Sequence, residues 1–173
     1  VETIFDMSFG DLFCVRIAGN VINDDILASI EYACNVVGAK LIMVLGHTRC
    51  GAIQSACDGI EKGHITQLLS KIKPAVNAEK ETTTERNGKN QTFVNHVTEL
   101  NVANTLQNIY KKSDILRTMI DSNEIGMVGA IYDVSSGKVS CKTYTEELST
   151  LDGDENKLLA QKFETILLEA KAS

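Results

Sequence analysis

The stretch LIMVLGHTRCGAIQSA, residues 41–56, joins an apolar run to a segment of small residues through a histidine and a cysteine. Residues 40–46 are apolar nearly throughout, which predicts a strand covered on both faces. The small residues after Gly51 predict a helix packed closely against a sheet. His47 then follows the strand directly, and Cys50 stands at the start of the helix. In open α/β sheets ligands bind at this carboxyl edge, so the pair is a candidate site.

The residues before this stretch predict a parallel sheet. Residues 11–19 (DLFCVRIAG) carry β-branched and aromatic residues and predict a buried strand. Asn23 provides an N-cap, and apolar residues recur at helical spacing until Gly38, which predicts an amphipathic helix over 23–37. Together with 40–46, the order strand, helix, strand predicts a right-handed βαβ unit.

The residues after it predict more helices and two further strands. A helix with apolar positions from Ile65 to Val76 should bend or end at Pro74. The later segments are an exposed polar connection (77–92), helical residues (93–121), a buried strand (125–134), an antiparallel edge strand (138–144) and an amphipathic helix (154–170). This last helix should cover the sheet or a second subunit.

The expected fold is therefore α/β, with a mostly parallel β-sheet flanked by helices and an antiparallel edge strand. At 173 residues the chain is long enough for one domain with a core. We expect a single domain over 1–173, with residues 145–173 as a C-terminal helical tail.

Charge and composition narrow the classes of partner. The net charge is −6, and no basic stripe appears, which argues against nucleic-acid binding. No apolar run reaches the ~18 residues of a membrane helix, so we expect no membrane partner. Five cysteines without a C-x-x-C pair indicate a reducing compartment, and we expect a cytoplasmic protein with a small-molecule substrate.

His47 and Cys50 are of the types that bind zinc. Thiolate and neutral imidazole are favoured zinc ligands, and a helix N-terminus stabilises thiolate. A catalytic zinc usually takes three protein ligands and a water, whereas only two are evident here. Cys57 lies seven residues after Cys50, about 10.5 Å along a helix, which is too far for two sulfurs on one ion. A thiol redox role for Cys50 is the weaker alternative, because no resolving cysteine lies nearby in sequence.

The remaining cysteines and histidines are more typical of packing or surface positions. Cys34 lies on the apolar face of its predicted helix, and Cys14 lies within a predicted strand. Cys141 is on the predicted edge strand. His64 and His96 lie in polar, helical surroundings, which predicts surface positions.

Three motifs in order resemble the β-class carbonic anhydrases: GDLFCVRIAGN (10–20), SIEYAC (29–34) and VLGHTRCGA (44–52). The resemblance covers roughly residues 1–144. It implies a zinc ion held by His47, Cys50 and a cysteine of an upstream Cys-x-Asp-x-Arg motif, whose Asp and Arg form a catalytic dyad. That motif would precede Val1, and so would a central strand of the sheet. We therefore expect the chain to be an N-terminally truncated form.

The implied activity is the reversible hydration of carbon dioxide to bicarbonate and a proton, by a homodimer or homotetramer. Carbon disulfide and carbonyl sulfide hydrolases share the fold and ligands, so a sulfur analogue is an alternative substrate. A relative that binds a partner or an anion without catalysis is a third reading, supported by the missing ligand motif.

Two further residues belong to the predicted site. Family members with an allosteric bicarbonate site use an arginine at the position of Arg16 together with a tryptophan, and this chain has no Trp. We therefore expect Arg16 to tie its strand to a neighbouring loop or subunit. Gly51 either lets the helix backbone approach the metal or serves tight packing.

Overall fold

The computed structural model describes residues 1–142 and contains a three-stranded sheet in the order β1-β2-β3. β1 (Leu41–His47) and β2 (Gly126–Tyr132) pair in parallel, with Leu41 opposite Gly126 and His47 opposite Tyr132. β3 (Val139–Lys142) runs antiparallel to β2. The α/β class, the parallel strands and the antiparallel edge strand are thus confirmed.

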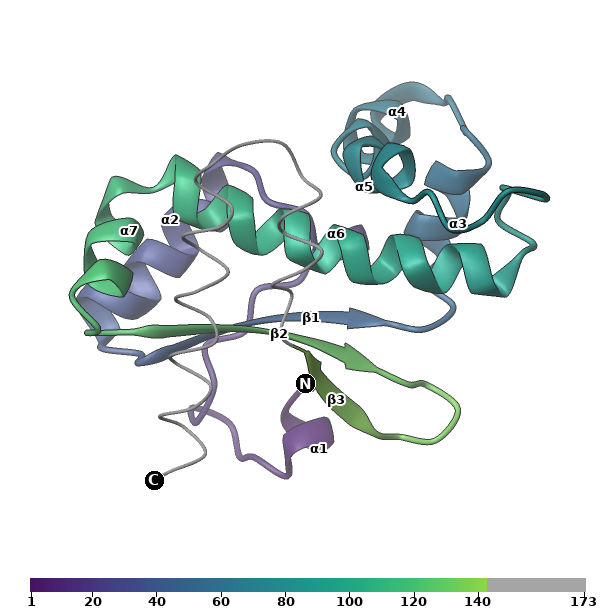
Figure 1. Cartoon of the computed structure of the whole chain (residues 1–173). Helices are drawn as coiled ribbons and strands as arrows, with labels where there is room; N and C mark the ends of the chain where they lie inside the picture. Colours follow the sequence, from purple (N-terminus) through teal and green to yellow (C-terminus); the bar gives the residue numbers. More distant parts are fainter. Residues whose placement is uncertain (143–173) are drawn as a thin grey trace.

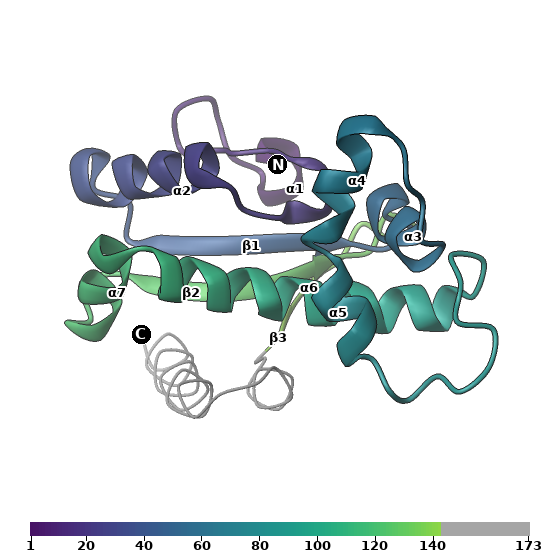
Figure 2. The same cartoon turned by 90° about the horizontal axis from the view of Figure 1, so that it is seen from above.

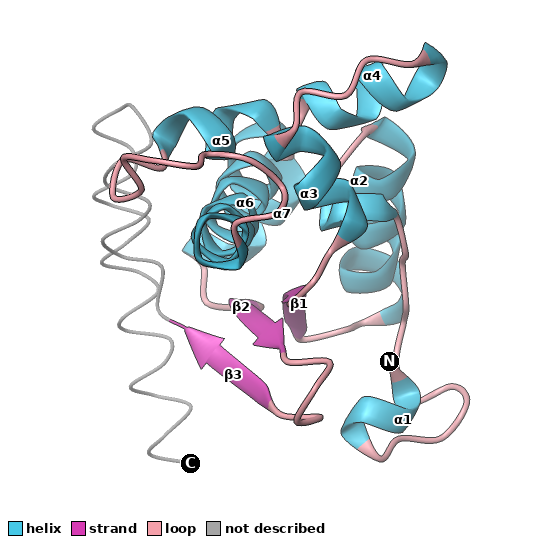
Figure 3. Cartoon of the chain, turned by 90° about the vertical axis from the view of Figure 1, so that its right-hand side faces the viewer, coloured by secondary structure: helices cyan, strands magenta, loops and turns pink. Residues whose placement is uncertain are grey.

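The larger helices lie on one side of this sheet (Figures 1 and 3). They are α2 (Asp24–Glu31), α3 (Gly51–Cys57), α4 (Gly63–Ser70), α5 (Lys73–Ala78), α6 (Gln91–Lys112) and α7 (Asp114–Asp121). Three short helical segments complete the described chain: α1 (Glu2–Phe5), the 3-10 turn η1 (Ala18–Asn20) and the π-helix η2 (Tyr32–Val37).

α6 organises the core. It lies along β1 and β2, with α2 beside it and α3, α4 and α5 around its N-terminal half (Figure 2). One apolar cluster fills the space between α6 and the sheet and includes Val44, Leu106 and Met127. A second cluster joins α6 to α3, α4 and α5. Because both clusters share α6, this helix is buried around most of its circumference.

The predicted strand at 11–19 is wrong. Residues 12–17 form no strand, η1 follows, and the sheet of the described chain contains no partner for this segment. Phe13 and Val15 keep 49% and 36% of their surface exposed. An extended segment becomes a strand only when a neighbour takes its backbone hydrogen bonds, so propensity alone was insufficient. The predicted βαβ unit is replaced by the parallel β1–β2 pair, which the segment from α3 to α7 connects.

The expectation that β1 is covered on both faces is also wrong for the described residues. Ile42, Val44 and Gly46 are buried, whereas Met43 and Leu45 between them are only partly buried. The buried set faces α6, since side chains alternate across a strand.

Most predicted helices are present with altered ends. The helix over 23–37 starts at the Asn23 cap, whose side chain accepts a hydrogen bond from the Ile26 N–H, and it ends at Gly38 after the π-helical turn. Pro74 sits in the first turn of α5 and separates it from α4, as predicted. The predicted helix over 154–170 and the tail over 145–173 lie outside the described residues. Among residues 1–142, no helix has the length and apolar character needed to cross a bilayer.

Candidate metal centre

The turn between β1 and α3 carries the candidate site. His47 is the last residue of β1, and Cys50 is the N-cap of α3, as the sequence predicted. The His47 side chain is exposed, whereas Cys50 is only 5% exposed. Arg49 between them has φ +58°, a left-handed conformation that turns the chain from the strand into the helix.

The turn that follows β2 holds the turn between β1 and α3 in place. The Thr48 N–H donates to the Tyr132 carbonyl at 3.0 Å, and the Thr48 hydroxyl donates to Asp133 at 3.3 Å. The Val134 N–H in turn donates to the Thr48 hydroxyl oxygen at 3.1 Å. The ends of β1 and β2 are therefore joined side by side through Thr48.

Asp133 is the centre of the turn that follows β2. The Ser135 hydroxyl, the Ser135 N–H and the Ser136 hydroxyl all donate to its carboxylate, at 2.6, 2.8 and 3.0 Å. These hydrogen bonds hold the pKa of Asp133 well below its usual range. The segment DVSSG signals such an Asx turn, and the sequence analysis missed its contact with the HTRC turn.

The ring of His47 has one defined neighbour, the Thr48 carbonyl, 3.0 Å from Nδ1. A carbonyl oxygen only accepts hydrogen bonds, so this contact is a hydrogen bond in the tautomer with the proton on Nδ1. In that tautomer Nε2 carries the lone pair that a metal requires.

His47 and Cys50 fit two of the four coordination positions of a zinc ion. An imidazole and a thiol at one turn match the donor chemistry that zinc favours. Within residues 1–142, however, no group of three His, Cys, Asp or Glu side chains is placed to hold a metal ion. The described chain thus supplies two candidate ligands, His47 and Cys50.

The other cysteines have different surroundings. Cys57 ends α3, and burial raises the pKa of its thiol to about 12, which disfavours the thiolate. Cys34 is buried in the core, as predicted, and burial raises its pKa too. Cys14 is only partly buried, and Cys141 is exposed on β3. His64 is exposed, whereas His96 is partly buried and lies 3.4 Å from Glu79.

Arg16 and Gly51 stand apart from any described ligand cluster. Arg16 is 68% exposed, and its guanidinium lies 3.4 Å from the Glu2 carboxylate of α1. A Cβ atom added to Gly51 would meet nothing within 4 Å, so close packing does not require glycine there.

The fold and the site define a class: an α/β protein with a His-x-x-Cys pair at the carboxyl edge of parallel strands. A model of the carbonic anhydrase family matches residues 1–139. Carbonic anhydrase 2 of Mycobacterium tuberculosis is 32% identical over 142 residues, covering 79% of this chain and 65% of that protein. The chain belongs to the β-carbonic anhydrase family.

Two other similarities are informative. A tetrameric β-carbonic anhydrase structure from Sordaria macrospora superposes with a TM-score of 0.69 at 24% identity, covering 81% of this chain and 72% of that one. A carbon disulfide hydrolase of Acidithiobacillus thiooxidans is 38% identical over 53 residues, 31% of this chain and 24% of that protein. The chain spans about two thirds of the length of the mycobacterial relative.

Proposed function

We propose that the protein catalyses the reversible hydration of carbon dioxide to bicarbonate and a proton. The observation that carries the proposal is the family match over residues 1–139, which includes the whole His47–Cys50 turn. The mycobacterial carbonic anhydrase supports it at 32% identity.

In this proposal His47 and Cys50 would hold a zinc ion as two of its protein ligands. Bound zinc lowers the pKa of water from 15.7 to about 7, and so supplies hydroxide at neutral pH. A hydrogen bond from His47 Nδ1 to the Thr48 carbonyl would leave Nε2 for the metal. Thr48 and Asp133 hold the turn that presents both ligands.

Replacing either ligand tests the proposal. We expect His47→Ala and Cys50→Ser to lose bound zinc and to reduce CO₂ hydration to the uncatalysed background. Zinc is measured by elemental analysis, and hydration by stopped-flow with a pH indicator. The matched control is Cys141→Ser, because Cys141 is an exposed thiol on β3.

Full zinc content and full activity in both ligand variants would contradict the assignment. Absence of zinc and activity in the unmodified natural protein would instead favour a non-catalytic binding protein.

The short similarity to the carbon disulfide hydrolase supports one alternative substrate. Hydrogen sulfide release from carbon disulfide, measured on the same zinc-loaded samples, distinguishes carbon disulfide from carbon dioxide as the substrate. Turnover of carbon disulfide without CO₂ hydration would replace the proposed substrate and leave the metal assignment intact.

A further inference from the structure

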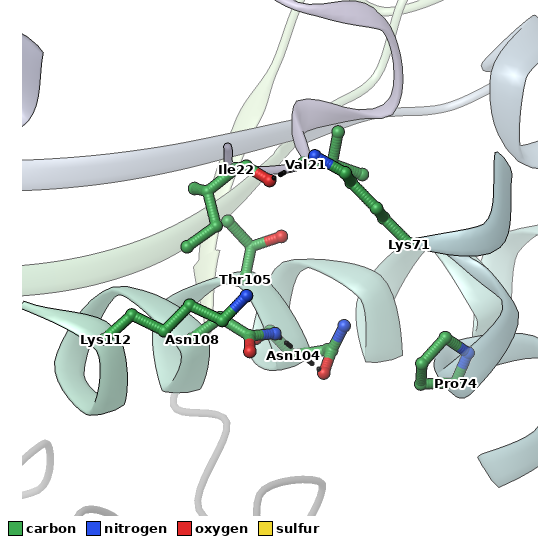
Figure 4. Close-up of a pocket in the computed structure, with 8 residues that line it drawn as sticks. All are labelled: Val21, Ile22, Lys71, Pro74, Asn104, Thr105, Asn108 and Lys112. Atoms are coloured by element: carbon green, nitrogen blue, oxygen red, sulfur yellow. Dashed lines mark hydrogen bonds between the residues drawn. The ribbon is translucent and has the colours of Figure 1, made fainter. Parts of the chain in front are cut away.

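A pocket of about 220 Å³ lies between α6, the segment before α2 and the α4–α5 junction. Lys71 and Lys112 line it from two sides, and Asn104, Thr105 and Asn108 of α6 form one wall (Figure 4). We call it the lysine pocket. It is separate from the His47–Cys50 turn, since neither residue lines it.

The pocket concentrates positive charge in a chain whose net charge is −6. Among the described residues, no carboxylate lines it, and neither lysine forms an ion pair there. Lys71 is partly buried, and its ammonium group donates to the Ile22 carbonyl at 3.0 Å. That bond uses one of its three hydrogens and fixes the charge at the pocket wall.

Asn104 provides an unused donor. The residue is only 8% exposed, and its side-chain oxygen Oδ1 accepts from the Asn108 amide at 3.1 Å. Its own amide nitrogen makes no hydrogen bond within the described chain and, in Figure 4, points away from Asn108 toward the space beside Lys71. This nitrogen is not among the fully buried polar atoms that lack a partner in the described chain, so it opens onto the pocket and is free to donate to a ligand there.

We propose that the lysine pocket binds a small oxyanion. Two ammonium groups and an amide N–H₂ offer donors from different directions, which suits an anion with several oxygen atoms rather than a single acceptor. The Thr105 hydroxyl donates to the Asn20 carbonyl at 3.0 Å and is not among these donors. The volume holds a phosphate or a short carboxylate with a few waters. This site does not depend on the proposed zinc chemistry.

The test is a titration of ¹⁵N-labelled protein with inorganic phosphate at constant ionic strength, followed through the side-chain amides of Asn104 and Asn108. We expect saturable shifts, and an affinity about tenfold weaker in Lys112→Gln and in Lys71→Gln. The matched control is Lys73→Gln, an exposed lysine two residues from Lys71 that does not line the pocket. A parallel acetate titration distinguishes a phosphate site from a carboxylate site.

Several results would overturn the proposal. Shifts that rise linearly with phosphate concentration would show that no saturable site exists. Shifts of the same size with chloride would also overturn the proposal. So would a loss of affinity in Lys73→Gln equal to that in Lys71→Gln and Lys112→Gln, because it would indicate a general effect of charge. Should Lys71→Gln fail to fold because it loses the contact with Ile22, Lys112→Gln decides, since Lys112 is exposed.

Discussion

At the scale of single residues, Gly46 is a point where α6 packs directly on the sheet. A Cβ atom added there would lie 2.7 Å from Val102 Cγ2, 3.0 Å from Ile131 Cδ1 and 3.3 Å from Thr98 Cγ2. At 2.7 Å the Val102 side chain, or the backbone that carries it, must shift. Gly46 also directly precedes His47, so its packing positions one candidate ligand.

We expect Gly46→Ala to lower the free energy of unfolding by about 1–3 kcal/mol, the usual cost of overpacking a core. Urea denaturation followed by circular dichroism measures this value. The control is Gly51→Ala, where the new methyl group meets nothing within 4 Å, and a change within about 0.5 kcal/mol is expected. Equal stability of the two variants would show that the sheet and α6 adapt freely at Gly46.

At the scale of elements, the connection between α5 and α6 is fastened by a buried carboxylate. Residues 77–92 are predicted from the sequence to be an exposed polar connection, yet Glu79 is only 2% exposed. Arg86 and the Thr82 N–H both donate to its carboxylate. Arg86 also lies over the Phe93 ring at 4.5 Å, which ties the connection to α6.

The ion pair of Glu79 with Arg86 predicts that the free energy of unfolding depends on pH. Burial alone would raise the pKa of Glu79, but hydrogen bonds from Thr82, His96 and Arg86 outweigh it, and the pKa falls below the ordinary value of 4.5. Ionised Glu79 therefore stabilises the fold above the unfolded-state pKa, and this contribution is lost as the pH falls through the folded-state pKa.

We expect Glu79→Gln to destabilise the protein by about 1.5–3 kcal/mol at pH 7, and by progressively less as the pH is lowered from 4 toward 3. Urea denaturation of both proteins across this range tests it. The control is Glu61→Gln, at an exposed position, for which no such convergence is expected. A difference that is constant over the whole range would exclude the ionised carboxylate as its source.

At the scale of the whole molecule, the first 41 residues leave many apolar side chains in solvent. Phe9 is 98% exposed, and the others include Phe13, Tyr32, Val36, Val37 and Leu41. Phe13 and Tyr32 lie with their ring centroids 6.3 Å apart, and contiguous exposed apolar side chains are typical of interaction surfaces. The family resemblance led us to expect a homodimer or homotetramer, and this exposed apolar surface is where a second copy would pack.

Light scattering after gel filtration should give a mass of two or four chains. Val36→Glu is expected to shift this mass toward that of one chain, because it places a charge in the apolar region. Ile60→Glu, at a 45% exposed position just after α3, is the control and should leave the mass unchanged. A single-chain mass at every concentration would contradict the proposal.

The sequence by itself determined the local features of this protein. Alternation and apolar runs located β1 and β2, the Asn23 cap and Gly38 bounded α2 and η2, and His47 and Cys50 fell at a strand end and a helix start as predicted. These features depend on backbone preferences and periodicity within a few residues, which a sequence states directly.

Only the tertiary structure decided which elements pair and which polar groups meet. Residues 11–17 have strand propensity but no partner in the described sheet, and a strand exists only through hydrogen bonds to another. The contact of Thr48 with Asp133 spans 85 residues, and the lysine pocket brings Lys71 to the distant Lys112. Such neighbours arise because packing α6 on the sheet brings distant segments together, and no local pattern encodes that contact.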